Sequence, residues 1–290
     1  MDATSIRIIL AVTIAFIYML FDIFNKRNVP EAYAYATLAI GAIAALFSGS
    51  IMLDAQTYLI AVAILGIGYA IYRSGQIGAA DIIEFAAIAM VIPIQQAAIL
   101  LPSINQYGLP FAISLLINTG IIAIIMVPIY YLPKAFIKHR KSFERIKRLD
   151  LYKLIIISAA YMGFASFLAL KFNITLYGAA ILLLLGVSSA VVMLFEGPIT
   201  SAMVVMSSYH EFTEGDIIAF NLMSQEEIKQ AKKIVPKFDR LVTKEIIAQM
   251  KEKNLEKKFP LYRNAIPLAL PIFVAVVCAI IAGNLMLVII

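Results

Sequence analysis

The chain has 290 residues, of which 62% are hydrophobic and 14% are charged, and its mean hydropathy is +0.91. Soluble domains usually carry about 45–50% apolar and about 25% charged residues, so this composition excludes an ordinary soluble globular protein. The formal net charge of +6 comes from Lys and Arg residues that lie between and after the apolar blocks, which indicates membrane topology rather than a nucleic-acid partner. A single cysteine, Cys278, excludes an internal disulfide and a cysteine-based metal cluster.

Long apolar blocks run through most of the sequence, and each is close to the ~20 residues with which an α-helix crosses a bilayer. We therefore predict an all-α fold, a polytopic membrane bundle of about eight transmembrane helices with a small cytoplasmic subdomain. The first block lacks the basic start and the cleavage site of a secretory signal peptide, so we expect it to be retained. The predicted spans are residues 6–24, 32–53, 58–72, 81–101, 109–132, 151–170, 174–195 and 266–290.

A charged stretch near the C-terminus divides the chain into three regions. We predict a transmembrane bundle at 1–206, a cytoplasmic helical subdomain at 207–264 and a C-terminal transmembrane helix at 265–290. The subdomain carries a helix-start signal, because Ser224 and Glu227 have the spacing of a capping box.

The distribution of basic residues predicts the orientation of the helices. If the side reached after the first span is called the inside, only Arg7 and Lys171 of the 24 Lys and Arg residues fall outside. The positive-inside rule makes the basic side cytoplasmic, with both termini outside. The basic run 134–148 then lies at the cytoplasmic face, where we expect it to contact anionic lipids rather than nucleic acid.

Ionisable residues within membrane spans are energetically costly, which makes them candidates for function. Asp22 lies near the inner end of the first span and Asp81 begins the fourth, so the predicted topology brings both aspartates to the cytoplasmic edge. Asp54 lies at the outer edge and cannot join them. Glu84 follows Asp81 by one helical turn on nearly the same face, and Glu196 marks the inner end of the seventh span.

Two carboxyl groups in one partly dry site can hydrolyse a peptide without a metal. Repulsion between them leaves the pair holding one shared proton. Such a pair orients a water, takes its proton during attack on a peptide carbonyl and protonates the leaving nitrogen. The only histidines, His139 and His210, lie in predicted cytoplasmic loops, which argues against a serine or cysteine hydrolase. Asp22 and Asp81 fit equally well as unrelated residues at helix ends, where charge is ordinary.

The local sequence around each aspartate favours the catalytic interpretation. Residues 75–81 read Gly-Gln-Ile-Gly-Ala-Ala-Asp, which resembles the motif of the GxGD membrane aspartyl proteases. The small residues Gly78 and Ala80 let backbones approach closely, so a peptide could lie against the site. Residues 21–30 read Phe-Asp-Ile-Phe-Asn-Lys-Arg-Asn-Val-Pro, which resembles the first-aspartate segment of prepilin peptidases. Each motif alone is weak, but both in this order on one predicted membrane face are fairly specific.

The C-terminal part resembles the archaeal branch of that family. Segment 214–219, the charged helices and the proline-containing run 264–271 resemble a cytoplasmic subdomain followed by a last span that opens with prolines. Two features depart from the family pattern. Its members are expected to have six spans, so residues 151–195 look like an inserted helical hairpin, and Ala80 stands where glycine is common. Presenilin-like proteases are a weaker match, because the first aspartate follows Phe21 rather than a tyrosine.

The resemblance implies an archaeal prepilin/preflagellin peptidase, an intramembrane aspartyl endopeptidase. Such an enzyme cleaves class III signal peptides of archaellin or type IV pilin-like precursors at the cytoplasmic face of the plasma membrane. It implies catalytic roles for Asp22 and Asp81, with Gly78, Ala80 and Glu84 shaping the site or contacting substrate. We expect no cofactor and no metal, and the expected partners are the precursor peptides and the lipid bilayer.

Two other functions fit the same acidic residues. A carrier or channel would use them to bind protons or cations, although such carboxyl groups are then expected at mid-membrane depth rather than at one edge. A non-catalytic assembly protein of a pilus or secretion system would keep a degenerate site, an alternative that the inserted hairpin leaves open. The sequence leaves the natural substrate and the oligomeric state open.

Overall fold

A computed structural model describes residues 3–25, 29–47, 49–74, 77–94, 110–138, 148–171, 174–253, 257–263 and 268–289. Within these residues the chain is mostly helical, with one two-stranded sheet. Five of the helices are long and apolar enough to cross a membrane, namely α1 (Ala3–Phe24), α3 (Ile51–Arg73), α5 (Phe111–Lys138), α6 (Arg148–Lys171) and α7 (Leu176–Leu194). Two shorter apolar helices are α2 (Glu31–Ala45) and α11 (Ala269–Ile281). The prediction of a helical membrane protein is confirmed at this level.

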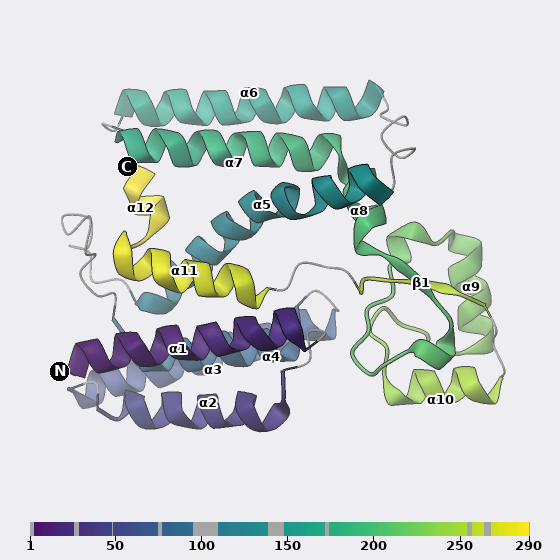
Figure 1. Cartoon of the computed structure of the whole chain (residues 1–290), viewed down its shortest axis with the longest axis horizontal. Coiled ribbons are helices and arrows are strands. Elements are labelled where there is room, and N and C mark those ends of the chain that lie inside the picture. Colours follow the sequence, from purple (N-terminus) through teal and green to yellow (C-terminus); the bar gives the residue numbers. More distant parts are fainter. Residues whose placement is uncertain are drawn as a thin grey trace.

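Successive helices of the bundle run in alternating directions (Figure 1). The first helix, α1, runs from the N-terminus toward the end of the bundle that faces a small polar subdomain, and α2 returns to the opposite end. The third helix then runs back toward the subdomain, where α4 (Ala79–Val91) begins. Both chain termini lie at the end away from the subdomain. The end of α1 and the start of α4 and of α11 therefore share one end of the bundle.

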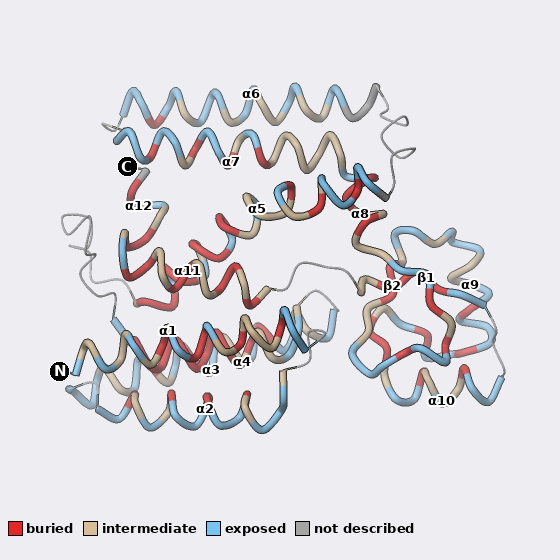
Figure 2. Tube along the Cα trace, in the orientation of Figure 1, coloured by how far each residue is buried: buried red, intermediate tan, exposed pale blue. Residues whose placement is uncertain are grey.

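Helix α4 is the central helix of the N-terminal bundle. It packs against α1, α2, α3, α5 and α11, and most of its residues are buried (Figure 2). Two glycines allow this close packing, as expected where helices contact each other in a membrane. A Cβ atom added at Gly41 of α2 would lie 2.7 Å from the carbonyl oxygen of Ala87, and one added at Gly68 of α3 would lie 2.4 Å from the side chain of Ile82.

The helix that begins the predicted fourth span, 81–101, is α4, and it ends at Val91. Pro93 follows two residues later, and a proline disfavours helical backbone in the residue before it and cannot donate to the helix ladder. The 13 residues of α4 therefore span only about 20 Å. Residues 95–109, which include the rest of this predicted span, lie outside the described residues.

The predicted second and third spans are wrong at their common boundary. The second helix ends at Ala45, and α3 begins at Ile51, so apolar residues assigned to one span belong to two helices. Gly49 adopts a φ of 102° in the turn, a conformation that glycine adopts easily. The hydroxyl of Ser50 then accepts a hydrogen bond from the backbone N–H of Leu53 and caps α3. A single polar capping residue indicates the start of a helix only weakly when the residues around it form a long apolar stretch.

The last predicted span, 266–290, is broken in its last third. Helix α11 ends at Ile281, and a short helix α12 (Leu285–Ile289) follows after Gly283, whose φ is 80°. The buried side chain of Asn118 in α5 donates a hydrogen bond to the carbonyl oxygen of Gly283 (3.0 Å) and accepts one from the N–H of Leu285 (2.8 Å). Backbone groups freed by a break inside a membrane need such partners. One side chain of α5 thus stabilises the break.

Helices α6 and α7 form the hairpin expected from the sequence, with residues 172–173 of its turn outside the described residues. The two helices pack along each other, and α7 also packs on α5 and α12 (Figure 1). The α6 helix is largely exposed, as expected for a helix at the lipid-facing edge of a bundle (Figure 2). After α7, the short helix α8 (Glu196–Met203) leads into the polar subdomain.

The polar subdomain has its own hydrophobic core, separate from that of the bundle. Strand β1 (Val205–Ser207) pairs antiparallel with β2 (Phe259–Leu261), which brings the two ends of the subdomain together. Between them lie α9 (Gln225–Ile234), α10 (Lys244–Glu252) and two 3-10 turns, η3 (Tyr209–Glu211) and η4 (Phe220–Leu222). The core contains Phe212, Ile218, Val235, Phe238, Val242, Ile246, Met250, Phe259 and Leu261. The helices α9 and α10 lie in the stretch where the sequence carries helical signals, whereas the sheet was not predicted.

The predicted capping box at the start of α9 is confirmed, because the Ser224 and Glu227 side chains each accept a hydrogen bond from the other's backbone N–H.

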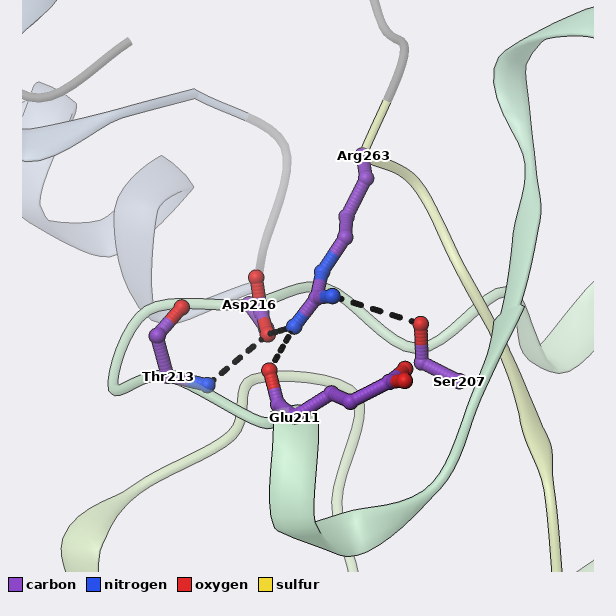
Figure 3. A network of polar contacts seen from close by, with 5 residues as sticks. All are labelled: Ser207, Glu211, Thr213, Asp216 and Arg263. Carbon is purple, nitrogen blue, oxygen red and sulfur yellow. Dashed lines mark hydrogen bonds and ion pairs between the residues drawn. The ribbon is translucent and has the colours of Figure 1, made fainter. Parts of the chain in front are cut away.

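A polar network centred on Arg263 lies at the C-terminal end of the subdomain (Figure 3). Arg263, two residues after β2, donates to the side chain of Asp216 at 2.8 Å, to the hydroxyl of Ser207 at 3.3 Å and to the carbonyl oxygen of Glu211. Asp216 also accepts a hydrogen bond from the N–H of Thr213 at 2.9 Å. The guanidinium therefore holds three segments together beside the paired strands.

The close contact at Gly41 yields a stability prediction. The Gly41→Ala variant places a Cβ atom against the backbone of α4, which has to shift, and we expect a loss of about 1–3 kcal/mol. Gly66→Ala in α3 is the matched control, because nothing lies within 4 Å of the added atom and alanine favours a helix. Thermal unfolding in detergent measures both. Equal stability of the two variants would contradict the proposed packing of α4.

The broken last helix yields a second stability prediction. Asn118→Leu leaves the Gly283 carbonyl and the Leu285 N–H without their partner, and each orphaned group is expected to cost about 1–3 kcal/mol. Thr119→Val is the control, because the buried hydroxyl of Thr119 has no hydrogen-bond partner in the described part of the chain. We expect that control to be neutral or stabilising in the same unfolding assay. A Leu variant as stable as the Val variant would show that Asn118 does not support the break.

Candidate active site

Asp22 lies in the last turn of α1, and its side chain is buried at 8% exposure. Its Oδ2 atom accepts a hydrogen bond of 3.2 Å from the backbone N–H of Ala269, the first residue of α11. The N-terminus of a helix has free N–H groups and a positive dipole end, both of which suit a carboxyl group. Asp22 is therefore positioned by two helices, α1 at the start of the chain and α11 near its end.

Asp81 lies in the first turn of α4 and is only partly buried. Its Oδ2 atom accepts a hydrogen bond of 3.2 Å from the backbone N–H of Gly78, the residue that precedes α4. A Cβ atom added at Gly78 would lie 2.8 Å from that same Oδ2 atom. Only a glycine at this position leaves the carboxyl group where it is, which gives a physical reason for the glycine of the motif. Ala80 packs against the core of the bundle.

Glu84 lies one turn after Asp81 and has no exposed surface. Both of its carboxyl oxygens are buried without a hydrogen-bond partner among the described residues. Asp81 and Asp22 both act on it electrostatically. The structure thus gathers three acids from α1 and α4 at one end of the bundle, as the predicted topology requires for Asp22 and Asp81.

Two tyrosines interact electrostatically with this acidic region, and the sequence analysis missed them. The hydroxyl of Tyr18 lies 3.1 Å from the hydroxyl of Thr37, and the hydroxyl of Tyr33 donates to the carbonyl oxygen of Ile14 at 3.3 Å. Their rings are 5.1 Å apart, and both interact electrostatically with Glu84. Tyr18 precedes Asp22 by four residues in one helix, a spacing that places both on one face and was available as a signal.

The other acidic candidates lie elsewhere. Asp54 is in the first turn of α3, at the opposite end of the bundle, where it acts electrostatically on Arg7. Arg7 donates to the last carbonyls of two helices, Ala44 of α2 at 2.7 Å and Val91 of α4 at 2.8 Å, and so has a structural role there. Glu196 begins α8 and pairs with Lys153 at 3.8 Å on the surface.

Several residues of the two motifs fall outside the described residues. They are Lys26, Arg27 and Asn28 after the first aspartate and Gly75 and Gln76 before the second, and residues 264–267 before α11 are not described either. The part of the chain that is described contains no group of three His, Cys, Asp or Glu residues that could hold a metal ion. The chemistry available to the described site is therefore that of carboxyl groups and tyrosine hydroxyls.

Comparison of the chain with protein-family models, with curated proteins and with solved structures finds no match. What the site can do thus has to be argued from its residues. A partly exposed carboxyl beside a buried one, at the end of a helical bundle, can hold a proton and a water at the edge of an apolar interior.

The placement of the two aspartates can be tested by cross-linking. In a chain whose only cysteine, Cys278, is replaced by serine, the pair Asp22→Cys and Asp81→Cys is expected to be joined by a short bifunctional thiol reagent in most molecules. Asp22→Cys with Asp54→Cys is the control pair and is expected to give no intramolecular product, because α3 begins at the far end. Peptide mass spectrometry reads out both pairs. If the first pair gives no cross-linked product, the two aspartates do not lie close together and the candidate site is wrong.

Proposed function

We propose that the chain is an intramembrane aspartyl endopeptidase whose catalytic pair is Asp22 and Asp81. One observation carries the proposal: two aspartates that are far apart in the sequence, one in the last turn of α1 and one in the first turn of α4, lie at the same end of two helices that pack against each other. Asp81 is partly exposed, so water can reach the pair, while Asp22 is buried and oriented by the start of α11.

The proposed mechanism needs no group beyond the pair and a water molecule. One aspartate is ionised and accepts a proton from the water as its oxygen attacks the scissile carbonyl carbon. The other aspartate is protonated and donates its proton to the carbonyl oxygen, which gives a neutral tetrahedral diol. The diol collapses when a proton returns from its hydroxyl to the ionised aspartate and the leaving nitrogen takes a proton from the other. The pair is then ready for the next cycle.

The proposed substrates are precursors of archaellins or type IV pilin-like subunits, as the resemblance to prepilin peptidases implies. Such a precursor has a short basic leader that stays in the cytoplasm and an apolar helix in the bilayer. An acidic pair at the helix ends beside the polar subdomain is suited to cleavage between those two parts (Figure 1). We further propose eight membrane spans in the plasma membrane, with α2, α4 and α11 as the shorter ones and the subdomain in the cytoplasm.

A proton- or cation-coupled carrier is the second candidate. The fully buried carboxyl of Glu84 favours it, because membrane transporters commonly use such groups. The position of Asp22 and Asp81 at one end of the bundle favours the peptidase instead, since a transport site is expected near the bilayer midplane.

Purified protein incubated with a precursor tests the proposal. Asp22→Asn and Asp81→Asn are each expected to lower the cleavage rate by at least about 10²–10⁴-fold, because the pair then lacks either its base or its acid. Asp54→Asn is the matched control at the far end of the bundle and is expected to cleave at the wild-type rate. The measurement is the amount of mature product on a gel, with folding checked by thermal unfolding.

Two results would reject the peptidase. If either aspartate variant cleaves at the wild-type rate, Asp22 and Asp81 are not the catalytic pair. A wild-type protein that does not cleave but moves protons or cations across liposomes would identify a carrier, and one that does neither would fit a non-catalytic assembly protein.

A further inference from the structure

The first strand of the polar subdomain, β1, has one open side. The extended backbone continues past both ends of the strand, because Val204 has φ −105° and ψ 141° and Ser208 has φ −81° and ψ 161°. Val205 is 37% exposed and Met206 is 56% exposed. Successive side chains of a strand point to opposite faces, so this part of β1 is uncovered on both faces.

The pairing of β1 with β2 shows which backbone groups face the open side. Met206 lies opposite Pro260, and the carbonyl oxygen of Pro260 accepts a hydrogen bond of 2.8 Å from the N–H of Ala219. Ala219 follows Ile218, which pairs with β2 on the edge that β1 does not occupy. Opposite residues of an antiparallel pair direct their backbone groups either toward each other or away from each other. The N–H and the carbonyl of Met206 therefore point away from β2, toward the open side.

These outward groups are available to another strand. In the part of the chain that the structure describes, the outward groups of Met206 and the backbone of Val204 have no hydrogen-bond partner. Strand β1 contains neither a charged residue nor a proline, two features with which proteins commonly block a strand edge. An open edge of this kind binds extended peptides, which add to the sheet as a further strand.

An acidic side chain lies beside the same strand. The guanidinium of Arg263 donates to the hydroxyl of Ser207 in β1 at 3.3 Å and to the carbonyl oxygen of Glu211, so Ser207 and Glu211 are neighbours (Figure 3). The charge of Arg263 is paired with Asp216 at 2.8 Å. Glu211 is exposed, and its carboxyl group forms no ion pair with the described residues. A negative charge beside the open edge suits a basic peptide.

The open edge also lies within reach of the candidate active site. Strand β2, the partner of β1, ends at Leu261, and Ala269, which donates to Asp22, follows eight residues later. Eight residues extend over at most about 28 Å. A peptide that pairs with β1 therefore needs only a segment of similar length to reach Asp22.

We propose that the open edge of β1 is the docking site for the precursor, whose basic leader adds to the sheet as an extended strand. The leader forms backbone hydrogen bonds with the N–H and the carbonyl of Met206, and a basic side chain of the leader contacts Glu211. The peptide bonds that follow the leader then reach the aspartate pair. This inference rests on the proposed peptidase function, because it names the substrate of that enzyme as the occupant.

The protein side of the contact is tested by removing one backbone donor. Met206→Pro deletes the outward N–H and keeps the β1–β2 ladder, because a proline is tolerated where its missing N–H faces away from the sheet. We expect the KM for the precursor to rise about tenfold and kcat to stay within about threefold of wild type, because binding alone is weakened. Met206→Thr is the matched control. It keeps both backbone groups in a residue that favours strands, and its KM is expected to stay within about threefold of wild type.

The substrate side is tested with the wild-type protein, so no variant has to fold. Precursors that carry a single N-methyl group at successive positions of the leader each lack one backbone N–H. A strand directs alternate N–H groups toward its neighbour, so KM is expected to rise at every second position and to stay near its ordinary value between them. The most sensitive of these precursors and Met206→Pro are expected to be non-additive, because both break the same pairing.

The acidic contact is tested by Glu211→Gln, which leaves the backbone carbonyl that binds Arg263 in place. We expect KM to rise by about two- to fivefold at low salt, and the difference to disappear at high salt. Glu226→Gln makes the same change at an exposed position at the start of α9 and is expected to leave KM unchanged.

The outcomes separate the docking site from the function on which it rests. A wild-type protein that cleaves no precursor rejects the peptidase and, with it, the precursor as the occupant. A folded Met206→Pro variant with a wild-type KM, or an N-methyl series without alternation, rejects the docking site and leaves the peptidase standing. An equal rise of KM in the Pro and Thr variants assigns the effect to the side chain and also rejects it.

The competing occupant is a second copy of the chain that pairs through its own β1. Light scattering of the purified wild type and of Met206→Pro distinguishes the two. A wild-type dimer that becomes a monomer in the Pro variant would identify the second copy and overturn the inference. A raised KM in the Pro variant alone, together with the alternating N-methyl pattern and an unchanged oligomeric state, supports the precursor.

Discussion

The close packing of α4 against its neighbours is the constraint on which the rest of the bundle depends. Gly41 and Gly68 leave no room for a side chain at the contacts with Ala87 and Ile82, so α2 and α3 hold α4 in one position. That position determines where the carboxyl groups of Asp81 and Glu84 lie, because both are on α4, which packs against α1. A helix packed this tightly can carry a buried acid that a looser bundle would hydrate or expel.

A second contact joins the two ends of the chain at the same place. The N-terminus of α11 donates to Asp22 of α1, so the helix that follows the polar subdomain helps to orient an acid of the first helix. Arg263 fixes the end of the subdomain from which the connection to α11 departs. The candidate site is therefore built from the first helix, the fourth helix and the last long helix, and it lies at the end of the bundle that faces the polar subdomain (Figure 1).

Some parts of the site could be predicted and others could not, for identifiable reasons. Asp22 and Asp81 could be placed at one membrane edge from hydropathy and loop charge alone, because each span crossing reverses the side that the chain is on. The partners of these acids could not be predicted. The contact of Asp22 with Ala269 joins residues 247 positions apart, and the approach of Tyr33 to Glu84 depends on how α2 packs on α4. Ser50 and Pro93 are local signals of helix boundaries in the sequence. Long apolar segments run across both residues, so the hydropathy pattern alone does not show these boundaries.

The sequence by itself determined that this is a helical membrane protein, and it predicted that the basic residues gather on one side and that two aspartates end on that side. These properties follow from hydropathy and charge, which act along the chain and need no knowledge of packing. Only the tertiary structure decided that α4 is short and central, that the last helix breaks at Gly283 beside Asn118 and that Glu84 is buried with no hydrogen-bond partner among the residues that the structure describes. Those features depend on contacts between helices. The effect of a glycine or an asparagine in such a contact depends on the residue that packs against it, and a single sequence does not show which residue that is.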